Sequence, residues 1–247
     1  RATGGQCSAA SAVYVLYYLR NLHRDRPDID LCIEGLAVGF GARTHADGID
    51  AVYYVAQKNY PVEFAEMEFG VRVEGYGIHC DSGGPGRYRG GCGIFRDIRI
   101  IAHEAILGVR MDNVRHPAWG VNGGMAGGSG FISVNPGTPG EQKLKPMSDG
   151  HHLRCGDLVR IVTAGGGGWG SPLERPAGQV HLDVLDGFIS AASARRDYGV
   201  VLSADETQVD AAATRALRAS MPVPNGMFHR RVYFDDAEPE SSSAGGR

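Results

Sequence analysis

The stretch Leu158-Val-Arg-Ile-Val-Thr-Ala-Gly-Gly-Gly-Gly-Trp-Gly-Ser-Pro172 is the part of this sequence that decides the fold. Its first residues, Leu158–Thr163, predict a strand that runs straight into the four glycines at 165–168. Because glycine lacks a Cβ, such a run reaches backbone conformations closed to other residues, and another surface can approach its peptide groups closely. We therefore interpret the run as a tight packing turn whose peptide groups border a cavity.

Two further glycine clusters accompany this run. One covers residues 83–93 and the other covers residues 120–130. Glycine accounts for 37 of the 247 residues, which is roughly twice the usual share. No Gly-X-Y period is present, so a collagen-like chain is excluded. Since the clusters lie between β-rich runs, we expect them to form turns and close backbone contacts.

The middle of the chain is predicted to be mainly β. Apolar and polar residues alternate in several short runs between Val62 and Asn113, which is typical of strands buried on one face. Phe131–Val134 is expected to be another short strand, closed by the turn sequence Asn135-Pro136-Gly137.

Helices are expected at both ends of the chain. The near-helical spacing of Val13, Leu16 and Leu19 predicts a helix over Ser8–Arg24 that Pro27 ends. The other predicted helices are Val180–Ser190, with an apolar face of Leu182, Val184, Leu185 and Phe188, then Ala191–Asp197, and Ser203–Ser220 capped by Ser203 or Asp205.

These patterns predict an α+β fold with a β-rich core, glycine-rich turns and a helical C-terminal region. Residues 1–176 are expected to form the core and residues 177–234 a helical segment packed on it. Residues 235–247 are acidic and then rich in Ser and Gly, so we expect a disordered tail.

Composition excludes several classes of function. The net charge is only -3, so nothing favours nucleic acid or an anionic membrane as a partner. No run of about 18 apolar residues predicts a membrane span, and no signal peptide is visible. The five cysteines are scattered and odd in number, which favours free thiols and a cytoplasmic chain over a disulfide framework.

Motifs for nucleotides and metals are incomplete. No GxxxxGK[ST] string occurs, and Gly84-Pro85-Gly86-Arg87-Tyr88-Arg89-Gly90 misses the GxGxxG spacing. His45 with Asp47 and Asp50, and His151-His152 with Asp149, are two possible metal clusters. Neither cluster has a known ligand spacing, so a solvated loop is favoured for both and no metal ligand is assigned.

Other reactive groups have simpler interpretations. Cys7 precedes the predicted front helix, whose dipole would lower the pKa of a thiol, but a lone cysteine is more often inert. The tryptophans at 119 and 169, each followed by a glycine, are expected to pack against glycine-rich backbone. Four arginines are possible anion ligands, with surface ion pairs as the favoured alternative: Arg87, Arg89, Arg96 and Arg115.

An ordered set of short strings resembles the hydantoinase B/oxoprolinase family. The resemblance spans roughly Cys32 to Leu202, and it depends on the order and spacing of the strings rather than on any one of them. The strings are Gly39-Phe40-Gly41-Ala42-Arg43, Asp47-Gly48-Ile49-Asp50, Pro61-Val62-Glu63, Asp81 to Gly91, Pro117-Ala118-Trp119-Gly120 with Gly123-Gly124, Asn135-Pro136-Gly137, Gly156-Asp157, Gly165 to Arg175, and Asp197 to Leu202.

The resemblance implies the C-terminal portion of a longer protein. Members of the family are more than twice as long, and this chain begins with Arg1 rather than Met, so we expect a processed product or one part of a longer polypeptide. The family's metal ligands, for a divalent ion such as Zn or Mn, lie in an N-terminal portion that is not in this chain. No ligand is therefore transferred to His45 or His151. A separate subunit carrying the N-terminal half is a possible partner.

The resemblance also implies an activity. Family members act with a hydantoinase A-type subunit that binds ATP-Mg, and together they open cyclic amides such as hydantoins, 5-oxoproline or lactams. We thus expect the C-terminal part of an ATP-dependent cyclic-amide hydrolase. The alternatives are a subunit of an ATP-dependent ketone carboxylase and a non-catalytic scaffold. Catalytic residues stay unassigned, and the candidates for the substrate cavity are Arg43, Asp47, Arg87, Arg89, Gly166 and Gly167.

Overall fold

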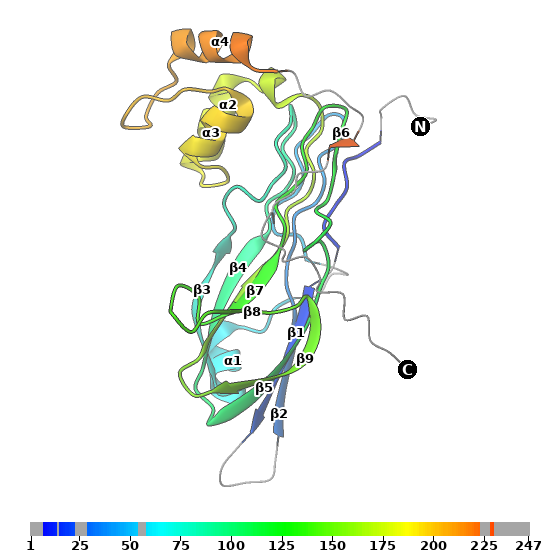
Figure 1. The fold of residues 1–247 in the computed structure, drawn as a ribbon, viewed down its shortest axis with the longest axis vertical. Coiled ribbons are helices and arrows are strands. Elements are labelled where there is room, and N and C mark those ends of the chain that lie inside the picture. Colours follow the sequence, from blue (N-terminus) through cyan, green and yellow to red (C-terminus); the bar gives the residue numbers. More distant parts are fainter. Residues whose placement is uncertain (1–6, 14, 23–28, 54–57, 223–227, 230–247) are drawn as a thin grey trace, which may run out of the picture.

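The computed structural model describes residues 7–13, 15–22, 29–53, 58–222 and 228–229, and it has the expected α+β architecture. Figure 1 shows an elongated molecule with the larger β-sheets at one end and helices α2, α3 and α4 at the other. Between them, long segments without regular secondary structure run side by side. In the described part of the chain, no helix is both long and apolar enough to cross a lipid bilayer.

Two antiparallel sheets form the lower half of the molecule. The first has the order β2-β1-β5-β9, and the second has the order β3-β4-β10-β7-β8. The first sheet consists of β1 (Val15–Leu22), β2 (Ile29–Gly35), β5 (Glu104–Met111) and β9 (Met147–Arg154). The second consists of β3 (Val71–Ile78), β4 (Ile94–Ile100), β7 (Phe131–Val134), β8 (Gln142–Lys143) and β10 (Leu158–Val162).

The two sheets share one hydrophobic core. Tyr17 and Leu107 from the first sheet belong to the same buried cluster as Ile98 and Ile161 from the second. Each fully buried aliphatic side chain contributes about 1.5–3 kcal/mol relative to an exposed one. This shared core is the main source of hydrophobic stabilisation for the sheets.

The predicted helix at the front of the chain is wrong, because β1 occupies its second half. Burial alternates along β1, with Val15, Tyr17 and Leu19 inside, while Leu16 and Tyr18 face outward. This period of two fits a half-buried strand, and valine and tyrosine favour strands. Residues 14 and 23–24 of the predicted helix lie outside the described residues.

One helix interrupts the region that was predicted to be mainly β. Helix α1 covers Val62–Glu68 directly after Pro61, and Ala65 is its buried residue. The aromatic rings of Tyr60, Phe64 and Phe69 pack together around it, with centroids 5.2–5.8 Å apart. This local aromatic cluster stabilises a helix that alternation of polar and apolar residues does not reveal.

The segments between the sheets and the helices form what we call the glycine bundle, made of residues 8–12, 39–48, 82–93, 118–130 and 164–170. The glycines at 165–168 lie at its centre and are buried. Their N–H groups donate to carbonyl oxygens of three other segments, at Gly128, Gly91, Ala10 and Met125, with N···O distances of 2.8–3.0 Å. Backbone groups that would otherwise be buried without partners are thereby satisfied outside any sheet.

Only glycine fits at the centre of this bundle. A Cβ on Gly166 would lie within 3.0 Å of the backbone of Phe40, and one on Gly167 would lie equally close to the backbone of Trp119. The same crowding of backbones requires glycine at the axis of the collagen triple helix. The packing interpretation of the run is therefore confirmed, and the run is extended rather than turned.

The helical end of the molecule follows the bundle. It contains a 3-10 turn, η2 (Pro172–Glu174), then α2 (Ala177–Leu185), α3 (Ala191–Tyr198) and α4 (Ala211–Ser220). A second, smaller core holds Val180, Ile189, Ala194, Tyr198 and Val200. Finally, two short strands, β6 (Gly120–Val121) and β11 (Phe228–His229), pair with each other.

The predicted helix at Ala191–Asp197 is confirmed as α3, whereas α2 covers Ala177–Leu185 instead of the predicted Val180–Ser190. Two further details of the helical end differ. Leu182 and Leu185 face outward instead of forming the apolar face of α2. α4 begins at Ala211, later than predicted, because Asp210 accepts the capping hydrogen bonds. Ser203 instead closes a local turn by donating to Asp205. The boundary between the predicted core and the helical segment, at residues 176 and 177, stays a prediction. The expected tail, residues 235–247, lies outside the described residues.

Candidate functional site

Asp47 lies where the glycine bundle meets the helical end. It belongs to the irregular connection between Gly39 and Asp50, which leaves β2 and enters the bundle. Both carboxylate oxygens of Asp47 accept hydrogen bonds from the Arg175 guanidinium, each at 2.8 Å. One of these oxygens also accepts from the Arg89 backbone N–H at 2.7 Å. Asp47 is therefore held by three donors from segments far away in the sequence.

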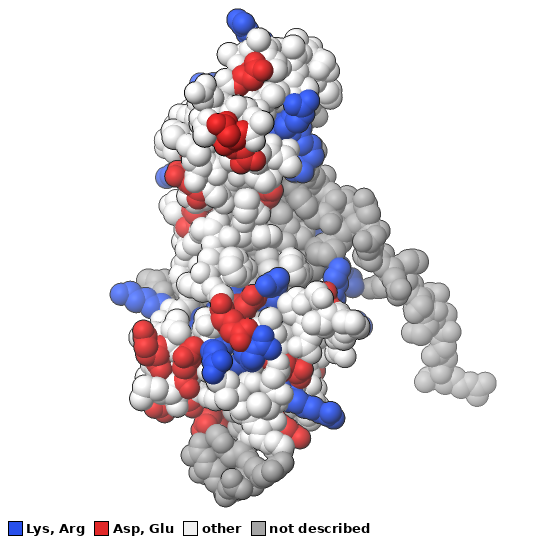
Figure 2. All heavy atoms as spheres, turned by 90° about the vertical axis from the view of Figure 1, so that its left-hand side faces the viewer, with Lys and Arg blue, Asp and Glu red and all other residues white. Residues whose placement is uncertain are grey.

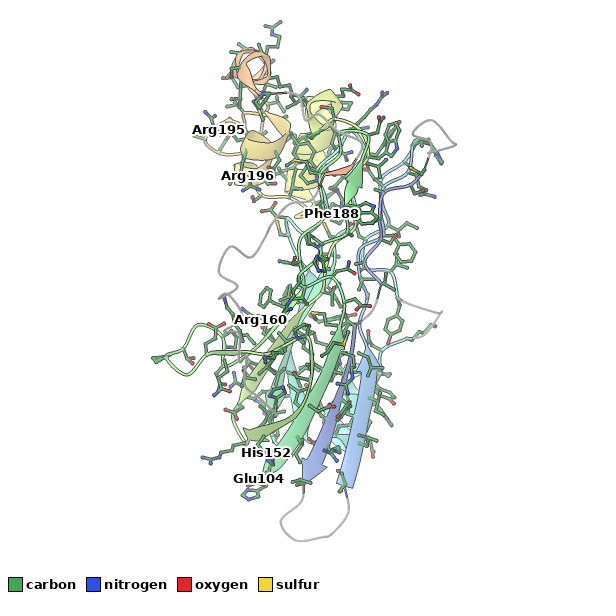
Figure 3. All side chains as sticks on the ribbon, turned by 45° about the vertical axis from the view of Figure 1, so that its right-hand side comes forward. Glu104, His152, Arg160, Phe188, Arg195 and Arg196 are labelled. Carbon is green, nitrogen blue, oxygen red and sulfur yellow. The ribbon has the colours of Figure 1, made fainter. Side chains whose placement is uncertain are left out.

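Arg89 is a buried cation of the site, with 3% of its surface exposed. Its guanidinium donates to both oxygens of Asp50, at 2.8 and 3.1 Å. The guanidinium carbon lies 4.6 Å from the ring centroid of Phe188, in the connection after α2. Figure 3 places Phe188 at the lower edge of the helical end, where the bundle arrives. This arrangement joins an ion pair to a cation–π contact.

Arg175 connects this loop to helix α2. Besides Asp47, its guanidinium contacts Asp183 on α2 at 2.9 and 3.2 Å and the Arg87 carbonyl oxygen at 3.1 Å. We call the set of Asp47, Asp50, Arg89, Arg175 and Asp183 the junction network. It contains two cations and three carboxylates, and its members come from four segments of the chain.

Burial governs the electrostatics of the junction network. Desolvation raises the pKa of Asp183, and the nearby guanidinium groups of Arg175 and Arg89 oppose that shift. Desolvation by itself would lower the pKa of Arg89, but the hydrogen bond and charge of Asp50 outweigh it, so the pKa of Arg89 is raised. Both arginines therefore stay charged, and each faces at least one carboxylate. Such a set is suited to holding segments together, since removing one partner leaves a buried charge uncompensated.

The structure brings only part of the predicted cavity together. Asp47 and Arg89 meet in the junction network, whereas the Arg87 side chain is 52% exposed. Arg87 lies 3.7 Å from Glu174 and 5.7 Å from the ring centroid of Tyr88. Arg43 is exposed on the same connection as Asp47. The assignment of these four residues to a substrate cavity stays a prediction.

The remaining two candidates, Gly166 and Gly167, lie inside the glycine bundle. Their N–H groups already donate to the carbonyl oxygens of Gly91 and Ala10, at 2.9 and 2.8 Å. In this structure those N–H groups are not available to a ligand. Their place at the border of a cavity stays a prediction as well.

The two possible metal clusters have other contacts. Asp149 pairs with Arg110 at 2.6 Å, and His151 contacts the Ser148 hydroxyl at 2.7 Å. These residues belong to strand β9 rather than to the expected solvated loop. Among the residues that the structure describes, no group of three His, Cys, Asp or Glu side chains is placed to hold an ion.

The surroundings of Cys7 and of two further arginines are also clear. Cys7 does not precede a helix, so the argument for a lowered thiol pKa no longer applies. All five cysteines are free, as expected. Arg96 is buried and forms an ion pair with Glu34 at 3.0 Å, so its role is structural. Arg115 is exposed. Trp119 is 37% exposed, and the Trp169 ring lies 6.0 Å from that of Tyr88.

Sequence reasoning missed Arg175, Asp183 and Asp81. Asp81 accepts hydrogen bonds from the N–H and hydroxyl of Ser190, both at 2.7 Å, and so fixes the start of α3 against the bundle. Arg175 and Asp47 are separated by 128 positions, so no short motif links them. The string Ser171-Pro172-Leu173-Glu174-Arg175 was a signal for the family but not for the ion pair.

Two hollows of the described part of the chain lie away from the six candidates. One of about 400 Å³ is lined by residues that include Met111, His116 and Met147, and another of the same size by residues that include His79, Phe95 and Arg160. Figure 2 shows charged side chains gathered over the sheets, with fewer over the middle of the same face.

Comparison with known proteins identifies relatives of this chain. The sequence profile described as Hydantoinase B/oxoprolinase matches residues 2–172. The chain belongs to the hydantoinase B/oxoprolinase family. The B-type subunit of a putative D-/L-hydantoinase from Pseudomonas sp. (strain NS671) is 33% identical over 182 residues, which are 72% of this chain and 30% of that protein.

Two solved structures share the fold. The ATP-dependent caprolactamase from Pseudomonas jessenii superimposes with a TM-score of 0.73 and 26% identity, over 85% of this chain and 38% of that chain. Acetone carboxylase in its nucleotide-free form gives a TM-score of 0.72 and 23% identity, over 86% and 33%, and this likeness concerns the fold alone. The chain spans about a third of the length of the curated relatives that it matches, between 28% and 34% for the first three.

Proposed function

We propose that this chain provides the C-terminal part of an ATP-dependent cyclic-amide hydrolase and acts with a hydantoinase A-type subunit. The observation that carries the proposal is the match of residues 2–172 to the family, together with 33% identity to the Pseudomonas sp. hydantoinase protein. The fold shared with the ATP-dependent caprolactamase supports a cyclic amide as the substrate class. Cytoplasmic localisation is part of the same proposal.

The proposed reaction needs phosphoryl transfer and an activated water, and we assign both to groups outside this chain. Resonance makes the C–N bond of a cyclic amide hard to break. The groups held elsewhere are proposed to supply phosphoryl transfer from ATP-Mg to the carbonyl oxygen and a water activated by a divalent metal, Zn or Mn. The present residues would bind and orient the substrate and shape the cavity in which negative charge develops.

Within this chain, the exposed arginines are the proposed contacts with that charge. Arg43 and Arg87 lie on the surface beside the junction network, and the Arg87 side chain is 52% exposed. Asp47 and Arg89 would act by positioning, because their polar atoms are engaged with Arg175 and Asp50. Gly166 and Gly167 would shape the cavity through the rigid bundle, since their N–H groups are occupied.

The test uses the assembled complex of this chain, a hydantoinase A-type subunit and a subunit with the N-terminal half. Arg87→Ala is expected to lower kcat for ATP-dependent hydantoin opening by about 10²-fold, the loss typical of removing one group that stabilises developing charge. Arg72→Ala, at an exposed position on β3, serves as the control. Turnover that is equal in Arg43→Ala, Arg87→Ala and the control would favour a scaffold without catalytic contacts.

A ketone carboxylase is the second proposed function, favoured by 27% sequence identity over 230 residues to an acetone carboxylase alpha subunit from Xanthobacter autotrophicus. The two reactions differ in their co-substrate. Ring opening consumes water, whereas carboxylation of a ketone consumes bicarbonate. ATP hydrolysis that depends on both bicarbonate and a ketone would establish the second function and exclude the first.

A further inference from the structure

Strand β2 presents an apolar stripe at the edge of the first sheet. The side chains of Ile29, Leu31 and Ile33 are exposed by 55%, 49% and 46%. Cys32 and Glu34, which alternate with them along the strand, are buried. The alternation means that the three aliphatic side chains point to the same outward face. We call these three residues the β2 stripe. Among the described residues, β2 is one of the two edge strands of its sheet, and Figure 3 shows it in blue along one side of the molecule.

The neighbouring strands extend this surface and border it with polar groups. Ile33 pairs with Tyr18, Leu31 with Arg20 and Ile29 with Leu22. Paired residues of antiparallel strands share one face, so Leu22 adds to the apolar area. Further across the sheet, the Tyr18 hydroxyl donates to Asp149 and Asp149 pairs with Arg110. An apolar strip with a polar rim is the common anatomy of a protein interface.

An edge strand of this kind is a liability if it stays uncovered. Soluble proteins protect sheet edges with lysine, proline or bulges, because unpaired backbone groups beside apolar side chains promote association. The seven residues of β2, Ile29–Gly35, contain neither lysine nor proline. Single exposed apolar residues elsewhere need no explanation, but three in a row along an edge indicate a contact surface.

The family relatives indicate what covers the stripe. The whole stripe lies within residues 2–172, which match the family, whereas exposed Leu182 and Leu185 on α2 lie beyond them. In the first three curated relatives the matching segment occupies only 28–34% of the chain. In each relative, about two thirds of the chain lies outside the matching segment and is available to pack against it.

We propose that the β2 stripe is the docking surface for the N-terminal portion of a hydantoinase B-type chain. That portion adds a strand along the edge of β2 and lays apolar side chains over Ile29, Leu31 and Ile33. Main-chain pairing supplies affinity, and the alternating aliphatic side chains set the register. This inference rests on the proposed function in one respect, the placement of this chain as the C-terminal part of a hydantoinase B-type protein. It does not depend on the proposed reaction, so its test measures assembly instead of turnover.

The experiment co-expresses the full 247-residue chain with the part of the Pseudomonas sp. hydantoinase protein that lies outside the match, which the proposed function takes to be its N-terminal portion. The wild-type chain is expected to purify as a one-to-one complex. Leu31→Lys is expected to weaken the complex about tenfold or more, since it places a charge in the apolar centre of the contact. Leu31→Thr keeps a residue that favours strands and is expected to weaken the complex less. This variant keeps the test informative if the lysine variant does not fold.

Leu182→Lys is the matched control, because it introduces the same charge at an equally exposed leucine outside the family match. Complex formation that survives Leu31→Lys as well as Leu182→Lys would overturn the proposal, as would failure of the wild-type chain to bind. A wild-type dimer that Leu31→Lys converts to monomer, without binding of the N-terminal portion, would assign the stripe to a second copy instead. A selective loss with Leu31→Lys supports the docking surface.

Discussion

At the scale of single residues, the central glycines are explained by the space around them. Gly166 lies where Phe40, Gly41 and Gly91 converge, and its N–H donates to Gly91 at 2.9 Å. No side chain fits there, and the backbone cannot withdraw without breaking hydrogen bonds to neighbouring segments. Packing therefore explains why glycine occupies this position, and the N–H of Gly166 is engaged in a backbone hydrogen bond.

Gly166→Ala is expected to prevent folding or to destabilise the chain by more than about 4 kcal/mol, a loss reserved for severe structural conflicts. The added Cβ would lie within 3.0 Å of the Phe40 backbone. Urea unfolding followed by circular dichroism measures the effect. The control is Gly178→Ala on α2, where a Cβ meets nothing within 4 Å, and it is expected to stabilise the chain by about 0.5–1 kcal/mol. Equal stability of the two variants would contradict this explanation.

Arg175 and Arg87 lie close together in space but differ in burial, so their ion pairs should contribute differently to stability. Arg175→Ala leaves Asp183 buried with only Arg89 near it, so a loss of about 3–5 kcal/mol is expected. Arg87→Ala removes an exposed pair at 3.7 Å and is expected to cost about 0–1 kcal/mol. The shift of the urea midpoint at constant slope measures both. A similar shift in the two variants would mean that the junction network does not hold the helical end in place.

At the scale of elements, the first sheet is fastened on its outer face by Tyr18, Arg110 and Asp149. These residues come from β1, β5 and β9, and Arg110 and Asp149 lie 2.6 Å apart. The hydrogen bonds from Arg110 and Tyr18 lower the pKa of Asp149 to about 2. Its charged form is therefore favoured by folding.

The consequence is a defined dependence of stability on pH. Because the folded pKa of Asp149 is depressed, its contribution is complete above the ordinary pKa of 3.8 and is lost as the pH falls towards about 2. Asp149→Asn should lower Tm at pH 6, and the difference from wild type should shrink between pH 4 and pH 2, in roughly that window. Tyr18→Phe should show a weaker form of the same trend. A difference in Tm that is independent of pH would contradict the assignment.

The elements also show how far the sequence predicts this structure. Local signals were enough for β10, the buried glycine run and the helices α2 and α3. They failed for β1, because this strand exists by pairing with β5, where Val15 lies opposite Met111 some 96 positions later. They failed for the start of α4, because Ser203 and Asp205 bond to each other rather than cap a helix.

Prediction of the site met the same limit. Asp47 and Arg89 were chosen from family strings, and they do lie together. Their shared partner Arg175 is distant in sequence, and nothing in a single sequence pairs a loop aspartate with an arginine 128 positions away. Which candidates are exposed and which are buried depends on the tertiary arrangement, so only the structure separates Arg87 from Arg89.

At the scale of the whole molecule, the glycine bundle joins the two large sheets to the helical end. The junction network ties segments together, and the exposed β2 stripe faces outward. Both features suit a part that completes a larger enzyme. The chain would hold the exposed arginines at a border that the rest of the assembly closes.

The most direct test of this account is ATP-dependent opening of a cyclic amide by the assembled subunits, measured with and without this chain and in the absence of bicarbonate. Ring opening and ATP hydrolysis should both require the chain and rise together with the concentration of the cyclic amide. Ring opening at an unchanged rate without the chain, or ATP hydrolysis that requires bicarbonate and a ketone, would contradict the account.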